Sequence, residues 1–242
     1  MSIQISRRAA MRGILSSTVS LALAPSILAQ HGPPPGKIAL RFNENPYGPS
    51  ASGLKAAAEA QEMGAYYPSA IPDELIKSIA TKNEIPVDNI VLSSGSNEAL
   101  HAAYVAWGKK GKVLTPELTY TDHIAYSLRM GVELVSVPLQ SDMSIDLDKM
   151  AAAVSDDISL VYICNPNNPT GMTLDGDTLR DFCRSVSKKA VVLIDEAYNE
   201  LTDKPDYTSM VDLVREEENV IVMRTFSKIF GMAGLRVGYG MA

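Results

Sequence analysis

The segment Asn219–Gly238, NVIVMRTFSKIFGMAGLRVG, decides the fold class because it places a lysine shortly after a strand-like apolar run. The continuous apolar run that opens it is typical of a strand whose two faces are both covered by helices. Lys228 follows this run beside two hydroxyl side chains, and Arg236 comes eight positions later. A lysine in this setting could bind an aldehyde covalently, with a phosphate held beside it. The alternative is an ordinary solvated lysine in a loop.

Strand-like runs alternate with helical patterns through most of the chain. Amphipathic segments predict helices at Asn97–Trp107, Leu147–Val154 and Leu174–Val186. Asp146 and Thr173 are the predicted caps of the last two. Alternation of this kind predicts an α/β fold with a mostly parallel seven-stranded sheet and helices on both faces. The predicted strands are Asn89–Ser93, Lys112–Thr115, Val132–Val137, Ser159–Cys164, Ala190–Asp195, Val220–Arg224 and Leu235–Met241.

Ligands of such sheets bind beyond the carboxyl ends of the strands, so unusual residues directly after strands are candidate site residues. The turn Ser93–Glu98, SSGSNE, follows the first predicted strand and opens a helix. The free N–H groups at a helix N-terminus and the positive end of its dipole together favour phosphate binding. An ordinary serine-capped helix is the alternative interpretation.

Two further segments follow strands. Asn165–Gly171, NPNNPTG, predicts a rigid turn. Its Asn168 could donate an amide hydrogen to an aromatic hydroxyl, although a purely structural turn is the alternative.

Asp195 ends an apolar strand, where a bare carboxylate is costly unless it is paired. A pyridinium nitrogen would be a suitable partner, and Tyr198 could hydrogen-bond a phenolate oxygen on the same ring. Metal binding by Asp195 and Glu196 is the rival interpretation.

Together these segments resemble the signatures of the fold-type I pyridoxal-phosphate enzymes, and within them the histidinol-phosphate aminotransferase branch of the class I/II aminotransferases. The resemblance runs from about residue 37 to residue 242 and includes two N-terminal segments, NENPYGPS at Asn43–Ser50 and YYP at Tyr66–Pro68. It implies an aspartate aminotransferase-like large domain with pyridoxal 5'-phosphate as the cofactor. It also implies transfer of an amino group between an amino compound and a 2-oxo acid.

By this resemblance, Lys228 is the Schiff-base lysine and the base that moves a proton between substrate and cofactor. Its pKa must be depressed for this role, and neighbouring cationic groups are the expected cause. Asp195 would pair with the ring nitrogen, while Asn168 and Tyr198 would contact the O3′ oxygen of the ring. Tyr120 would stack on the ring. Lys228, Asp195 and Tyr198 are therefore the predicted catalytic residues.

The resemblance also implies how the cofactor phosphate is held. Tyr67 would reach the phosphate bound to a neighbouring subunit, which predicts a homodimer. Within one subunit, the expected phosphate ligands are Ser96 and Asn97 through their backbone, Thr225, Ser227 and Arg236.

The N-terminus predicts a separate segment. Residues 1–30 contain the pair Arg7-Arg8 before a short apolar run and resemble a Tat-like signal peptide. This implies export to the periplasm or the cell exterior; a cytoplasmic protein with a chance arginine pair is the alternative. Residues 31–65 would form an N-terminal segment, and residues 66–242 a cofactor-binding large domain truncated before a C-terminal small domain. In the family that small domain carries the arginine that binds the substrate carboxylate. We therefore expect this chain alone to have little or no transaminase activity.

The expected substrates are an amino acid or an amino-alcohol phosphate together with a 2-oxo acid. The same cofactor would also serve a decarboxylase or a carbon–sulfur lyase, because the cofactor supports cleavage of several bonds at the substrate Cα. Nothing in these residues fixes which bond is cleaved. An inactive cofactor-binding fragment is the non-enzymatic alternative.

Composition argues against several other classes. The net charge is −6 and no basic cluster lies outside the N-terminus, so nucleic acid is not an expected partner. The N-terminal apolar run is too short to span a membrane. Cys164 and Cys183 are predicted to be buried free thiols. No metal site is expected, because no histidine stands at metal-ligand spacing from a cysteine or carboxylate; the histidines are His31, His101 and His123.

Overall fold

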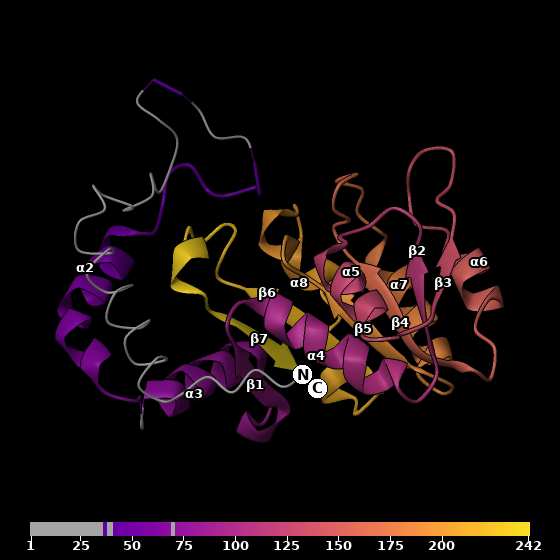
Figure 1. Cartoon of the computed structure of the whole chain (residues 1–242), viewed down its shortest axis with the longest axis horizontal. Helices are drawn as coiled ribbons and strands as arrows, with labels where there is room; N and C mark the ends of the chain where they lie inside the picture. Colours follow the sequence, from indigo (N-terminus) through magenta and orange to yellow (C-terminus); the bar gives the residue numbers. More distant parts are fainter. Residues whose placement is uncertain (1–35, 38–40, 69–70) are drawn as a thin grey trace, which may run out of the picture. The chain divides into compact units, whose positions relative to one another are not determined.

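Seven strands form a single mixed sheet with the order β1-β7-β6-β5-β4-β2-β3 (Figure 1). The computed structural model describes residues 36–37, 41–68 and 71–242, so the predicted signal peptide lies outside the described residues. The chain divides into the units Met1–Arg41 and Phe42–Ala242, and every element named below belongs to the second. The strands are β1 (Ile90–Ser93), β2 (Lys112–Pro116), β3 (Leu134–Val137), β4 (Ile158–Cys164), β5 (Val191–Asp195), β6 (Val220–Thr225) and β7 (Gly238–Met241).

The strand β7 runs antiparallel to both of its neighbours, β1 and β6, and the other four strand pairs are parallel. The predicted mostly parallel, seven-stranded sheet is therefore confirmed. The predicted start of the last strand at Leu235 was wrong. Leu235 ends the 3-10 helix η4 (Ala233–Leu235), and Arg236 has a left-handed backbone with φ of 57°. A strand does not contain this conformation, so β7 begins only at Gly238.

Helices cover both faces of the sheet, as the continuously apolar strands predict. On one face, Leu100 and Tyr104 of α4 belong to the same buried cluster as the strand residues Leu160 and Leu193. Figure 1 shows α4 lying in front of the sheet. On the other face, α3, α6, α7 and α9 contribute to a second buried cluster. The helices are α2 (Ala51–Glu59), α3 (Ile71–Asn83), α4 (Ser96–Gly108), α5 (Asp122–Arg129), α6 (Leu147–Ala152), α7 (Gly176–Val186), α8 (Pro205–Thr208) and α9 (Val211–Arg215), with 3-10 turns η1 (Gln61–Ala65), η2 (Val87–Asn89) and η3 (Asn199–Leu201).

Side-chain caps set where the helices begin. Asp146 caps α6, as predicted. The helix α7 begins later than predicted because Asp175, and not Thr173, is its cap: the Asp175 carboxylate accepts a hydrogen bond from the backbone amide of Thr178. A carboxylate at this position satisfies a free N–H group and interacts favourably with the helix dipole.

The cysteines lie among the described residues, whereas the N-terminal apolar run does not. Cys164 and Cys183 are buried free thiols, as predicted. Within the described ranges, no helix is long and apolar enough to cross a lipid bilayer.

The ends of β5 and β6 place neighbouring residues on opposite faces of the sheet. Successive side chains of a strand alternate between faces. Asp195 and Thr225 accordingly line a cavity beside the N-terminus of α4. Glu196 and Arg224 instead form a buried ion pair, with 2.8 Å between Arg224 Nη2 and Glu196 Oε2; the Arg224 side chain is 8% exposed and the Glu196 side chain 0%.

Further hydrogen bonds complete this ion pair. The backbone amide of Met210 donates to Glu196 Oε1 at 2.6 Å, and the Ser209 hydroxyl donates to Glu196 Oε2 at 3.0 Å. Arg224 also donates to the side chain of Asn83 in α3 at 3.2 Å. Removing one partner of such a buried, fully hydrogen-bonded ion pair strongly lowers the stability of the fold, because the other charge is left buried and unpaired.

We expect Glu196→Ala to lower the free energy of unfolding by about 3–5 kcal/mol, because it leaves the Arg224 guanidinium buried without a counter-charge. Urea denaturation followed by circular dichroism measures this. The matched control is Glu216→Ala, since Glu216 pairs with Arg184 at 2.8 Å but the two side chains are 45% and 39% exposed. That pair is worth only about 0–1 kcal/mol. Equal losses in the two variants would contradict the assignment.

Candidate functional site

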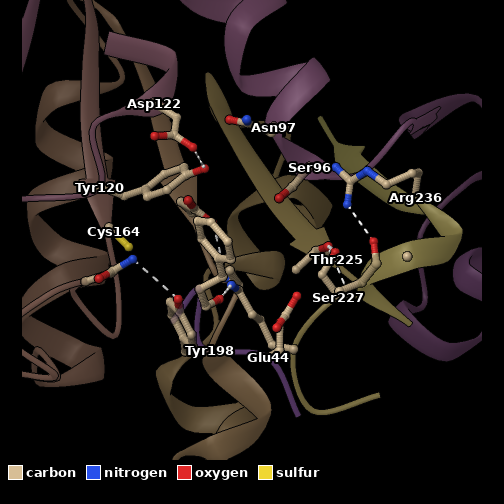
Figure 2. A pocket seen from close by; sticks show the side chains of 17 residues that line it. Glu44, Ser96, Asn97, Tyr120, Asp122, Cys164, Tyr198, Thr225, Ser227 and Arg236 are labelled. Carbon is tan, nitrogen blue, oxygen red and sulfur yellow. Dashed lines mark hydrogen bonds between the residues drawn. The ribbon is translucent and has the colours of Figure 1, made fainter. Parts of the chain in front are cut away.

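A cavity of about 330 Å³ opens beyond the carboxyl ends of β4, β5 and β6 (Figure 2). This size is within the range of small-molecule sites. With the exception of Tyr67, all predicted site residues line it: Ser96, Asn97, Tyr120, Asn168, Asp195, Tyr198, Thr225, Ser227, Lys228 and Arg236. Residues separated by as many as 140 positions are thus brought to one edge of the sheet, where the strand-end rule places ligands.

Lys228 is presented by the loop that follows β6. Its Nζ donates a hydrogen bond to the backbone carbonyl of Phe42 at 2.8 Å and lies 5.5 Å from the centroid of the Tyr198 ring. Partial burial lowers the pKa of Lys228, and the nearby Arg236 lowers it further, while Asp195 is the strongest opposing influence. A lowered pKa leaves more of the amine neutral, which is the form that attacks a carbonyl group.

The Lys228 loop is held in place by the N-terminal segment predicted from its NENPYGPS sequence. The Asn45 side chain donates to the carbonyl of Ile229 at 2.7 Å. Gly231, with φ of 69°, packs so closely on the backbone of Gly48 that a side chain there would collide with it. This contact explains why the loop needs glycine at that position.

Asp195 is the buried carboxylate of the site, with 3% of the residue exposed. Its Oδ1 accepts a hydrogen bond from the backbone amide of Ala197 at 3.1 Å, and its Oδ2 accepts one from the Tyr162 hydroxyl at 3.2 Å. Burial raises the pKa of Asp195 to about 6, against the lowering effects of these two hydrogen bonds and of Lys228. Asp195 forms no salt bridge with any described residue. A cationic ligand atom would stabilise its charged form.

Tyr198 receives hydrogen bonds from two asparagines. Asn43 Nδ2 donates to its hydroxyl oxygen at 3.0 Å and Asn168 Nδ2 donates at 3.4 Å. The hydroxyl hydrogen therefore remains available to an acceptor in the cavity. The turn that carries Asn168 contains two cis peptide bonds, Asn165-Pro166 and Asn168-Pro169.

The Asp195-Glu196 pair does not act as a joint metal ligand set. Asp195 faces the cavity, whereas the carboxylate of Glu196 is occupied by Arg224 and by the amide of Met210. No group of three or more potential metal ligands occurs among the described residues.

A cradle for an anion lies at the N-terminus of α4. Gly95 caps this helix with φ of 74° and without a side-chain hydrogen bond, so the serine-capped alternative is not the one adopted. The first N–H groups of a helix lack acceptors within the helix, which leaves the amides of Ser96 and Asn97 available. Arg236 lies directly beside Gly95, and its Nη2 donates to the Ser94 carbonyl at 3.2 Å. On the other side, the hydroxyls of Thr225 and Ser227 are 2.9 Å apart.

Tyr120 forms a wall of the cavity (Figure 2). Its hydroxyl donates to Asp122 Oδ2 at 2.9 Å, which fixes the ring, and burial raises its pKa. Tyr67 lies elsewhere: it is 99% exposed and does not line the cavity. Its expected role in a neighbouring subunit stays a prediction.

Some cavity residues escaped the sequence prediction. Asp122 follows the predicted Tyr120 by two positions, and Cys164 pairs in register with Asp195 across β4 and β5. The register could have identified Cys164, because partners in adjacent strands point to the same face. Burial raises the pKa of Cys164, so it remains a thiol. Glu44 lies within the predicted Asn43–Ser50 segment and Phe42 directly precedes it, and both line the cavity.

Residues 35–242 match the family described as aminotransferase class I and II. The chain belongs to this family. It is 39% identical over 209 residues to histidinol-phosphate aminotransferase 1 of Cupriavidus pinatubonensis, an alignment that covers 86% of this chain and 55% of that protein. It is 34% identical over 212 residues to histidinol-phosphate aminotransferase of Shouchella clausii, covering 85% of this chain and 56% of that one. The chain thus spans about half the length of the aminotransferases it matches.

Solved aminotransferase structures share the fold. Histidinol-phosphate aminotransferase from Sinorhizobium meliloti, solved in complex with pyridoxal-5'-phosphate, superposes with a TM-score of 0.75 at 29% identity and covers 83% of this chain and 55% of that one. The enzyme of the same name from Clostridium acetobutylicum gives a TM-score of 0.73 at 29% identity, with coverages of 83% and 59%. The family and the fold expected from the sequence motifs are therefore confirmed.

We expect Gly95→Ala to weaken anion binding at the cradle strongly, because the added Cβ would displace the Arg236 guanidinium. The thermal protection given by inorganic phosphate measures binding. Gly131→Ala is the matched control: its φ is 83°, but no heavy atom lies within 4 Å of the added Cβ. Both variants should lose stability from backbone strain, about 1 kcal/mol for Gly131→Ala and about 1–3 kcal/mol for Gly95→Ala, because φ of 74° and ψ of 155° at Gly95 are adopted readily by glycine alone. Only Gly95→Ala should lose the protection by phosphate; if Gly95→Ala kept it, the cradle would not be formed by these residues.

Proposed function

We propose that this chain is the cofactor-binding part of a pyridoxal 5'-phosphate-dependent aminotransferase, with Lys228 as the residue that carries the cofactor. The observation that carries this proposal is the convergence of three complementary groups in one cavity. They are an amine of lowered pKa, a buried carboxylate without a salt bridge, and an anion cradle at a helix N-terminus. One flat ligand with an aldehyde, a basic ring nitrogen and a phosphate matches all three.

The donor set fits this cofactor. Asp195 would hold the protonated ring nitrogen, and Tyr198 with Asn168 would hold the phenolic oxygen. The phosphate would lie among the amides of α4, the two hydroxyls after β6 and Arg236, which can pair with it through charged hydrogen bonds. Asn97 also lines the cavity, and its Oδ1 is a buried polar atom that has no hydrogen-bond partner among the described residues. When bound, the cofactor supplies an electrophilic aldehyde and an electron-withdrawing ring that makes the Cα–H bond of the substrate acidic.

The protein side chains would perform the remaining steps. The neutral amine of Lys228 would attack the aldehyde carbon with loss of water, and the freed amine would later accept and return a proton, for which its lowered pKa suits it. Asp195 would keep a proton on the ring nitrogen as long as Asp195 is itself ionised. Tyr120 and Ala197 line the cavity beside these groups.

We propose an amino-alcohol phosphate or an amino acid as the amino donor and a 2-oxo acid as the acceptor. The support is the likeness to aminotransferases named for histidinol phosphate, at 34% to 39% identity. Decarboxylation is not favoured by any particular residue. The structural likeness to L-threonine-O-3-phosphate decarboxylase from Porphyromonas gingivalis, at 19% identity, shows a shared fold alone.

We expect Lys228→Ala to abolish covalent capture of the cofactor. The chain is mixed with pyridoxal 5'-phosphate and reduced with borohydride, and its peptides are then analysed by mass spectrometry. The cofactor mass should lie on the peptide containing Lys228 and should fall to background in the variant. Lys188→Ala, which removes an exposed lysine outside the cavity, should label like the parent chain. Labelling on another lysine would overturn the assignment.

The same proteins test the reaction. The chain is supplied with ¹⁵N-labelled histidinol phosphate and 2-oxoglutarate, and the formation of ¹⁵N-glutamate is followed by NMR. Label in glutamate that depends on Lys228 supports amino transfer by this chain. Cofactor capture without any transfer would support the inactive-fragment alternative.

We further propose a homodimer in which Tyr67 of the partner subunit completes the phosphate cradle. The helix α2 and the turn η1 contain no buried residues. The apolar side chains around them are strongly exposed, with 56% for Leu54, 52% for Met63 and 79% for Tyr66. A second chain of the same kind would remove this apolar surface from water.

We expect Tyr67→Phe to weaken pyridoxal 5'-phosphate binding several-fold without dissociating the dimer, because it removes one hydroxyl that reaches the phosphate. Equilibrium dialysis measures the affinity, and sedimentation velocity measures the oligomeric state. Tyr66→Phe removes the neighbouring hydroxyl and is the control. A monomeric parent chain, or equal affinities in both variants, would refute the proposed contact.

A further inference from the structure

Asp195 is held from inside the protein by a tyrosine that does not line the cavity. Tyr162 lies in β4 two residues before Cys164, which pairs in register with Asp195 of β5. Its side chain is 0% exposed, and its hydroxyl donates to Asp195 Oδ2 at 3.2 Å. The other carboxylate oxygen accepts from the amide of Ala197. Each oxygen of the carboxylate therefore has one protein donor, and both donors are independent of any ligand.

We propose that Tyr162 is a positioning residue for the site: its hydroxyl fixes the Asp195 carboxylate so that the remaining lone pairs face the cavity. This inference rests on the proposed function, because a fixed carboxylate matters here only if it receives the ring nitrogen of the cofactor. Two donors on different oxygens prevent rotation of the carboxylate about its Cβ–Cγ bond. Preorganisation of this kind is what a site needs to hold a ligand atom in one place.

The Tyr162 ring is itself held in place by aromatic neighbours. His123 packs edge-on against it with 4.7 Å between ring centroids, and Tyr104 does so at 5.6 Å. His123 and Tyr104 are both 0% exposed. Burial lowers the pKa of His123 to about 3, so this histidine is neutral and adds no charge beside the carboxylate. The orientation of the Tyr162 hydroxyl is thus determined by packing.

The hydroxyl also influences the charge of Asp195. Burial disfavours the carboxylate, and a hydrogen bond donated to it favours the carboxylate. The titratable or charged groups around it are Lys228 on the loop after β6, Cys164 of β4, Tyr104 of α4, Tyr120 before α5, and Glu196 and Tyr198 after β5. Of these, only Lys228 is a cation, so the neutral donors carry much of the stabilisation of the charged form.

The test compares two matched variants of the full chain without cofactor. Tyr162→Phe removes the hydroxyl that reaches Asp195. Tyr104→Phe removes a hydroxyl from the same buried cluster, one that faces Thr115 and makes no hydrogen bond to Asp195. The carboxyl carbon of Asp195 is titrated by ¹³C NMR and assigned with Asp195→Asn. We expect Tyr162→Phe to raise the pKa of Asp195 by about 1, and Tyr104→Phe to leave it near the parent value.

A second measurement needs no substitution at Tyr162. The carbon that bears the Tyr162 hydroxyl should change its chemical shift with the same pH midpoint as Asp195, because the hydrogen bond couples them. It should lose this titration in Asp195→Asn. This keeps the inference testable if Tyr162→Phe fails to fold, which circular dichroism would reveal.

The third measurement concerns the cofactor. As the pH falls, affinity for pyridoxal 5'-phosphate should be lost when Asp195 becomes protonated. A raised Asp195 pKa moves this loss to higher pH, so the midpoint in Tyr162→Phe should rise by about 1. Unchanged Asp195 titration in Tyr162→Phe, with no titration at the Tyr162 carbon, would overturn the inference. Failure of the parent chain to bind the cofactor would instead overturn the proposed function, and the two NMR titrations would still decide the role of Tyr162.

Discussion

The buried ion pair between Glu196 and Arg224 is the constraint on which the site depends. It joins the ends of two adjacent strands on the face of the sheet opposite the cavity, at 2.8 Å and nearly out of contact with water. Because side chains alternate along a strand, fixing these two residues also fixes the direction of their neighbours Asp195 and Thr225. The residues of the ion pair and the residues that face the cavity are thus neighbours in sequence whose side chains lie on opposite faces of the sheet.

The second constraint is the close approach of backbones around the anion cradle. Gly238 at the start of β7 packs against the amide of Ser96, and Gly95 packs against the guanidinium of Arg236. A side chain at Gly238 would collide with the backbone of Gly95 and Ser96, and a side chain at Gly95 would displace the Arg236 guanidinium, so the first turn of α4 and the residues before β7 come into direct contact. Phosphate-sized anions are bound most tightly where backbone N–H groups and an arginine can reach them together. The glycines therefore define the dimensions of the cradle.

The sequence predicted most of this arrangement because its signals are local. Continuous apolar runs located the strands, and polar residues directly after Cys164 and Ile194 indicated the cavity edge. The errors have tertiary causes. The last strand was predicted to begin at Leu235, but the left-handed backbone at Arg236 prevents a strand from starting before Gly238. Tyr162 was not predicted, since its hydrogen bond to Asp195 depends on the register between β4 and β5, which a single apolar run does not encode.

The position of β7 in the sheet has a consequence for the order of events during synthesis. The strand β1 has β7 as its only neighbour in the described sheet, and Asn89 bonds to Ala242 across 153 positions. While the chain leaves the ribosome, β1 therefore has no strand partner until residues 238–241 have emerged. Contacts so distant in sequence form slowly. Arg236 reaches the turn at Gly95 only once the residues before β7 have been synthesised, so the anion cradle cannot form before residues 236–241 have left the ribosome.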